Sequence, residues 1–203
     1  MDTLIGGAGD DTYIVDTTGD VITEAAIRGN DTIISTVTYT LANLPNVENL
    51  TITGNSAINA TGNGGNNLLI GNEGANTMIG NAGDDILVGM GGRDTLSGGA
   101  GKDNFLFNAP GEGIDTITDF NVIDDTLNVI GGGFGGLVAG NAITPAQFSI
   151  GSSATTADHR FIYNRTTGAL FFDVDGSGAG AAVQFASLSP NLNLTTADIF
   201  IGG

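Results

Sequence analysis

The strongest constraint on the fold is a nine-residue repeat in the middle of the sequence. Five blocks follow one another without a gap from Gly62 to Leu106, and each has glycine at its first and fourth positions. The sixth position is asparagine or aspartate, and the eighth is a large apolar residue. So short a unit has to stack on its neighbours to bury its apolar side chain. The blocks are GNGGNNLLI, GNEGANTMI, GNAGDDILV, GMGGRDTLS and GGAGKDNFL.

Each block divides into a turn and a short strand. The glycines permit backbone angles that are closed to other residues, and the last three residues form a strand that points one side chain inward. Two blocks then make one coil, and stacked coils give two parallel sheets around a thin core. That core is expected to contain the eighth-position side chains, which are Leu69, Met78, Leu87, Leu96 and Phe105.

Stacking determines which polar side chains meet. Asn67, Asp85 and Asp103 should form a column along one edge, and Asn76 should lie above Asp94 on the other. Neighbouring turns lie about 4.8 Å apart, so ionised carboxylates in a column repel one another unless a cation lies between them. Calcium suits such a gap because it accepts six to eight oxygen ligands in a flexible geometry. Two alternatives remain: a disordered glycine-rich linker, and a solenoid that needs no metal, the latter mainly for the asparagine blocks.

Composition agrees with a cationic ligand. The chain of 203 residues has 22 acidic residues against 5 Lys and Arg, which gives a net charge of -17. This balance argues against nucleic acid and anionic membrane surfaces as partners. The sequence has no cysteine and one histidine, no secretory signal peptide at its start, and no apolar run long enough to span a membrane.

The nonapeptides resemble the GGxGxDxUx calcium-binding repeats of the RTX (repeats-in-toxin, hemolysin-type) family, in which U is a large apolar residue. The resemblance implies a parallel β-roll with calcium between successive turns. In the family, one turn offers positions two, four and six, and the turn eighteen residues later offers positions one, three and six. Carried over, the three implied sites are Asn81, Gly83 and Asp85 with Gly98, Ala100 and Asp103; Asn72, Gly74 and Asn76 with Gly89, Gly91 and Asp94; and Asn63, Gly65 and Asn67 with Gly80, Ala82 and Asp85.

The implied sites differ in charge. The Asp85 and Asp103 site has two carboxylates, whereas each of the others replaces one carboxylate with the amide of Asn67 or Asn76. We therefore expect calcium affinity to rise toward the C-terminal end of the array. Downstream, the sequence GIDTITDF resembles the motif that ends the roll in the family, so Asp115 and Asp119 are further candidate ligands, with solvated strand-edge charges as the alternative.

The array divides the chain into three parts. Residues 1–61 carry a looser version of the repeat, interpreted as a degenerate β-solenoid without metal, with a calcium site at Asp11 and Asp31 as the alternative. Residues 62–107 are the five tandem nonapeptides. Residues 108–203 resemble the non-repetitive end of RTX proteins, which implies a β-sandwich-like cap and an uncleaved type I secretion signal ending in Asp198 to Ile201.

Three other motifs compete with this interpretation. The sequence DVDGSG from Asp173 imitates the start of an EF-hand loop, but a hairpin turn is favoured because no helices flank it. The glycines of Gly131 to Gly136 formally satisfy GxGxxG without a following helical pattern, and His159 has no neighbouring nucleophile pattern. No constellation predicts catalysis.

Together these observations predict an all-β, non-enzymatic, calcium-binding module. The resemblance implies an extracellular or cell-surface protein, exported by type I secretion machinery and folded by calcium, whose passenger we expect to lie outside this chain. A carbohydrate-binding or adhesive module, like those attached to alginate epimerases, is the alternative.

Overall fold

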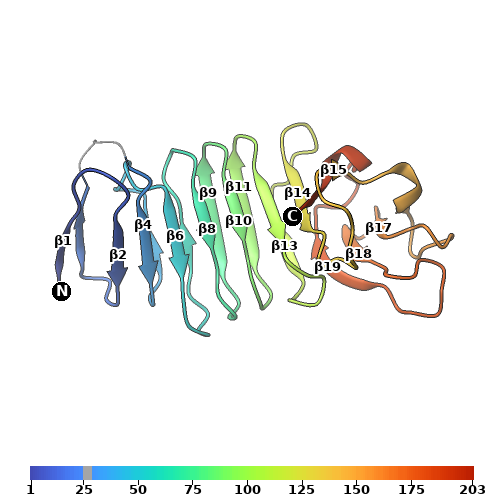
Figure 1. Cartoon of the computed structure of the whole chain (residues 1–203), viewed down its shortest axis with the longest axis horizontal. Helices are drawn as coiled ribbons and strands as arrows, with labels where there is room; N and C mark the ends of the chain where they lie inside the picture. Colours follow the sequence, from blue (N-terminus) through green and yellow to red (C-terminus); the bar gives the residue numbers. More distant parts are fainter. Residues whose placement is uncertain (25–28) are drawn as a thin grey trace.

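The glycine turns and short strands wind the chain into stacked coils. In the computed structural model, which describes residues 1–24 and 29–203, the coils follow one another along the long axis from the N-terminal end to a C-terminal cap (Figure 1). The structure is a β-roll, as the sequence predicts. Its described part has only two short 3-10 helices, η1 (Pro145–Gln147) and η2 (Thr196–Asp198), and no helix long and apolar enough to cross a membrane.

Two nine-stranded sheets form the walls of the roll. The first contains, in order, β15 (Asn141–Ala142), β20 (Ile199–Gly202), β14 (Thr126–Ile130), β12 (Asn104–Phe107), β10 (Ile86–Val88), β8 (Leu68–Ile70), β6 (Asn49–Ile52), β4 (Thr32–Ser35) and β2 (Thr12–Val15). The second contains β16 (Phe148–Ile150), β17 (Phe161–Asn164), β18 (Ala169–Phe172), β19 (Val183–Ser187), β13 (Asp115–Ile117), β11 (Thr95–Ala100), β9 (Thr77–Ala82), β7 (Ala60–Thr61) and β5 (Tyr39–Thr40). A separate pair joins β1 (Thr3–Ile5) and β3 (Val21–Thr23).

The strand register confirms the predicted stacking of every second block. Leu87 lies opposite Leu69 on one side and Phe105 on the other, and Met78 lies opposite Leu96 in the second sheet. All five of these eighth-position side chains are fully buried. The period therefore sets both the register and the core, because each coil brings the same position over its predecessor.

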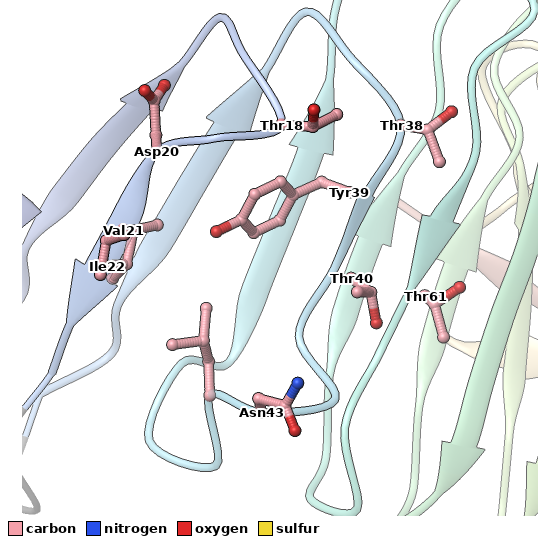
Figure 2. Close-up of a pocket in the computed structure, with 10 residues that line it drawn as sticks. Thr18, Asp20, Val21, Ile22, Thr38, Tyr39, Thr40, Asn43 and Thr61 are labelled. Carbon is pink, nitrogen blue, oxygen red and sulfur yellow. The ribbon is translucent and has the colours of Figure 1, made fainter. Parts of the chain in front are cut away.

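The first coils keep this winding without the regular glycine turns. β2, β4 and β6 continue the first sheet in parallel, so the threonine and β-branched segments form strands here. On the opposite wall, however, among residues 1–24 and 29–203, β3 pairs only with β1, and β5 pairs only with β7. The resulting break holds a groove of about 550 Å³, into which the Tyr39 ring points (Figure 2).

The cap extends both walls beyond the repeats. β20 pairs in parallel with β14, and β19 pairs in parallel with β13, while β18 pairs antiparallel with both β17 and β19. Between these layers Phe134 contacts Phe161, Phe172 and Phe185, with ring centroids 5.1 to 6.1 Å apart. The cap therefore closes the open end of the roll, as solenoids require.

The apolar side chains of the cap are not all buried. Phe161, Tyr163, Leu170, Phe172 and Phe185 are buried. Val174 is 63% exposed because β18 ends before it, and Val183 at the start of β19 is 44% exposed. Both valines flank the connecting turn, where no second layer covers them.

Candidate calcium sites along the two edges of the roll

A column of position-six side chains runs along the first edge, where the turns lead into the first sheet. The Asn67 backbone N–H donates to Asp85 Oδ1 at 2.7 Å, and the Asp85 N–H donates to Asp103 Oδ1 at 3.0 Å. Each side chain therefore reaches back to the turn before it. The three predicted residues of this column lie together as expected.

The same pattern runs along the second edge. The Asn76 N–H donates to Asp94 Oδ1 at 2.7 Å, and the Asp94 N–H donates to Asp115 Oδ1 at 3.1 Å. Asp115 is thus the next member of this column. It gives Asp94 a carboxylate neighbour in the column, from outside the tandem array.

Each position-six aspartate of the array has one oxygen that accepts no hydrogen bond from the described residues. The buried Oδ2 atoms of Asp85, Asp94 and Asp103 have no donor within the described residues, although all three side chains are at most 1% exposed. A buried carboxylate oxygen without a donor is strongly unfavourable. A calcium ion, which takes only oxygen ligands, would satisfy these atoms, so the residues present fit the metal.

Backbone oxygens converge on the same positions. A Cβ atom built on Gly80 would lie against both Asp85 Oδ2 and the Gly98 carbonyl oxygen, and one on Gly98 would lie against Asp103 Oδ2. Asn81 and Gly83 have φ angles of 85° and 109°, in the left-handed region that favours glycine. The first-position glycine is therefore required because carboxylate and carbonyl oxygens occupy the space of a side chain.

The pKa values of the column aspartates are raised, as expected for buried carboxylates without a nearby positive charge. Loss of contact with water raises the pKa of Asp85 to about 7 and that of Asp94 to about 6. Burial likewise raises the pKa of Asp115 to about 7, and the pKa of Asp103 is raised by burial and by the charges of Asp125 and Asp119. Without a cation, these carboxylates resist ionisation.

The asparagine blocks are built differently. The side-chain oxygen of Asn67 accepts from the Asn63 N–H at 2.8 Å, and that of Asn76 accepts from the Asn72 N–H at 2.9 Å. Neither leaves a buried oxygen without a donor. In the two implied sites that include these asparagines, only the aspartate, Asp94 or Asp85, has a side-chain oxygen without a donor.

The two acids predicted downstream of the array lie on opposite edges. Asp115 joins the second column, but the exposed Asp119 lies on the first edge, where its carboxylate accepts from the Gly98 and Gly99 N–H groups and from Ser97 Oγ. The two candidate ligands therefore belong to different columns.

Asp125 continues the first column and was not among the predicted ligands. The Asp103 N–H donates to its Oδ1 at 3.0 Å, and Asp125 is 7% exposed. A usable signal was present in the sequence, because Asp125-Thr126-Leu127 repeats the pattern of Asp94-Thr95-Leu96. A fixed period of eighteen residues does not align Asp125 with Asp103, because this coil contains four extra residues.

A second acidic cluster lies near the N-terminal end. Carboxylate oxygens of Asp11, Glu24 and Asp31 lie within 4.8 Å of one another, the Tyr13 hydroxyl donates to Glu24, and the Asp11 N–H donates to Asp31 Oδ1 at 2.8 Å. The sequence suggested Asp11 and Asp31 together, and Glu24 comes from the next half-coil. This geometry agrees with the alternative interpretation of the first part of the chain.

The competing motifs form ordinary turns. DVDGSG lies between the antiparallel strands β18 and β19, where Asp175 accepts from the Gly180 N–H at 2.9 Å, so it is the expected hairpin connection. The glycine segment after β14 carries the fully buried Phe134, and His159 Nδ1 accepts from the Thr155 N–H.

Comparison with known proteins agrees with this geometry. The RTX calcium-binding nonapeptide repeat matches in four copies, at residues 2–22, 61–96 and 79–109. The fold and the two acidic columns define a calcium-binding β-roll. Residues 2–22 and 61–109 contain RTX calcium-binding nonapeptide repeats.

Solved structures also match, 29 chains in all. One is the solution structure of the AlgE6R3 subunit from the Azotobacter vinelandii mannuronan C5-epimerase, with 26% identity and a TM-score of 0.47, covering 72% of this chain and 79% of that chain. No curated protein sequence matches significantly.

Proposed function

We propose that calcium bound between successive turns drives the folding of this protein, and that the folding follows export from the cell. The observation that carries the proposal is the set of buried, unpartnered Oδ2 atoms of Asp85, Asp94 and Asp103, stacked in columns of like charge. Asp115 and Asp125 extend the two columns. The ligand set is that implied by the family, with Asp125 added and Asp119 left to its hydrogen bonds with the turn.

The energetics favour a switch between unfolded and folded states. Ordering glycine costs roughly 0.5 to 1 kcal/mol per residue more than ordering alanine. A calcium site with a dissociation constant of about 10⁻⁴ M contributes about 1.4 kcal/mol at millimolar calcium. A handful of such sites is comparable with the whole stability of a small domain, about 5 kcal/mol or more. In cytosolic calcium, the array stays unfolded.

The position of the C-terminal segment supports export before folding. Residues that resemble the family's secretion signal form β20, which lies between β14 and β15, and Ile199 and Ile201 are at most 4% exposed. A receptor would reach this segment only in the unfolded chain. RTX repeat proteins are typically secreted, and we assign the chain a non-catalytic, extracellular role beside a passenger carried elsewhere.

Calcium-dependent circular dichroism of the full chain tests this function. We expect β structure in millimolar calcium and its loss in excess chelator, with recovery when calcium is restored. Magnesium at the same concentration is the control, because it demands a tighter octahedral geometry. Equal β content with calcium and with chelator would refute the proposal.

The groove beside Tyr39 favours a second candidate function, the binding of a neutral saccharide. The half-buried Tyr39 ring lies in this groove, which Thr18, Thr38, Thr40, Thr61 and Asn43 also line (Figure 2). The neighbouring Asp20 carboxylate disfavours an acidic sugar. Its pKa is lowered by hydrogen bonds from the Asp2 backbone N–H and the Thr17 hydroxyl.

Nuclear magnetic resonance titration distinguishes this candidate. In saturating calcium, neutral oligosaccharides should shift the amides of Tyr39 and its threonine neighbours, and Tyr39→Ala should abolish the shifts. An equal response to an oligouronate, or unchanged shifts in the variant, would exclude it.

A further inference from the structure

We infer that two asparagine pairs, Asn63 with Asn67 and Asn72 with Asn76, are amide clips that take the place of calcium where the repeat array joins the irregular coil before it. The inference rests on the proposed calcium-driven folding and adds that one region of the roll folds without calcium. This region comprises residues 49–79, from the start of β6 through the first half of β9. It forms without the metal and presents a folded edge to the repeats that follow.

The first clip joins the first nonapeptide to the turn before β6. The Asn63 side-chain amide donates to the carbonyl oxygens of Leu44 and Val47, both at 2.8 Å. The Asn67 amide donates to the Glu48 carbonyl oxygen at 3.2 Å. Three carbonyl oxygens of one turn therefore accept hydrogen bonds from amide groups of the next turn. In the aspartate blocks, the equivalent gap between stacked turns contains a carboxylate oxygen without a donor.

The second clip repeats this arrangement on the opposite edge. The Asn72 amide donates to the Thr53 and Ser56 carbonyl oxygens at 3.3 and 3.1 Å, and the Asn76 amide donates to the Ile58 carbonyl oxygen at 2.7 Å. Two independent turns thus use the same pair of positions, two and six of the nonapeptide, for the same purpose.

The clips are closed within themselves. Asn63 Oδ1 accepts from the Gly65 N–H at 2.8 Å and from the Asn67 amide at 3.2 Å, and Asn72 Oδ1 accepts from the Gly74 N–H and the Asn76 amide in the same way. All four asparagines are at most 6% exposed. A fully satisfied buried network of neutral groups needs no counter-ion.

The contrast with the aspartate blocks gives the physical reason. At position six, Asp85, Asp94 and Asp103 present a second oxygen, not an amide, to the gap, and that oxygen has no donor. Convergent carbonyl oxygens can be stabilised by N–H donors or by a cation. Asparagine supplies the donors within the chain, whereas aspartate leaves the gap to the metal. The change from turns stabilised by asparagine amides to turns that need calcium falls between Asn76 and Asp85.

Hydrogen exchange of the full chain, measured by mass spectrometry in chelator and across a calcium titration, tests the inference. We expect peptides within residues 49–79 to be protected already in chelator, and peptides within residues 83–126 to gain protection only with calcium. Equal loss of protection in both segments in chelator would overturn the clips but leave the proposed function standing. Protection of both segments in chelator would overturn the proposed function instead.

Asn63→Asp with Asn72→Asp tests the amides directly. The change replaces the donating nitrogens with oxygens that face carbonyl oxygens, so protection of residues 49–79 in chelator should fall roughly tenfold or more. Millimolar calcium should restore it. Asn55→Asp is the matched control, because Asn55 is exposed in the turn between β6 and β7. Wild-type protection of the double variant in chelator would overturn the inference, as would equal losses in the control.

Discussion

Replacement of Asp103 by asparagine separates the metal from the hydrogen bond at one position. Asp103 Oδ1 accepts from the Asp85 N–H, while its Oδ2 is buried without a donor, and the Asp103 N–H donates to Asp125. Asparagine keeps an oxygen acceptor for Asp85 but removes the charge. Any change in calcium response then reports the carboxylate and not the loss of the hydrogen bond.

The expected magnitude follows from the column. Asp103 borders two gaps, one shared with Asp85 and one with Asp125. If each gap holds calcium with a dissociation constant of about 10⁻⁴ M, loss of both sites lowers the free energy of unfolding by up to about 3 kcal/mol at millimolar calcium. Asp103→Ala should lose a further 1–3 kcal/mol, roughly, because the buried Asp85 N–H is left without an acceptor.

Without calcium, the destabilising effect of Asp103→Asn should disappear or reverse. In chelator, Asp103→Asn removes one of several repelling carboxylates, so residual β structure should be unchanged or greater than in the wild type, whereas Asp103→Ala should have less.

Urea unfolding followed by circular dichroism, at millimolar calcium and in chelator, measures both effects. Asp84→Asn is the control, since Asp84 is an exposed neighbouring aspartate whose Oδ1 accepts from the Lys102 N–H. If Asp103→Asn matched Asp84→Asn at millimolar calcium, the assignment of Asp103 to a calcium site would be wrong.

Three further predictions address pH, turn geometry and the core. The pKa of Asp85 is raised to about 7 in the folded chain, above its ordinary value, so metal-free folding should be most favourable in acid and weaken as the pH rises toward 7. If chelated protein had no more β structure at about pH 4.5 than at about pH 8, this prediction would be wrong. Gly80→Ala should destabilise the calcium form by about 1–3 kcal/mol because its Cβ meets oxygens, while Gly64→Ala, whose Cβ meets nothing, serves as the comparison in thermal unfolding. Phe105→Ala should cost about 3–5 kcal/mol in urea unfolding because the ring is fully buried, and a loss no larger than that of an exposed residue would refute its core position.

Much of the first edge could be predicted from the sequence. The position of Asp85 between Asn67 and Asp103 follows from an eighteen-residue coil, because every residue in a regular solenoid lies over its equivalent one coil earlier. The same reasoning gave the register of Leu69, Leu87 and Phe105. Prediction succeeded wherever the period was constant.

It failed where coil length changed. Asp115 lies 21 residues after Asp94, and Asp125 lies 22 residues after Asp103, so a fixed period could not align either of them. The resemblance still suggested Asp115 and Asp119 as ligands, but it could not show that Asp119 lies on the opposite edge from Asp115. Glu24 was missed for a similar reason, since its place beside Asp11 and Asp31 depends on the path of an irregular turn.

The sequence by itself determined the coil, the inward side chains and the presence of two acidic columns, because a repeated turn and strand can stack in only one register. Only the tertiary structure decided which oxygens are satisfied. Asn67 and Asp85 occupy the same position of the repeat, yet the amide of Asn67 finds a carbonyl oxygen in the irregular coil before it, while Asp85 Oδ2 finds no donor. That difference depends on the neighbouring turn, whose backbone path no repeat pattern specifies.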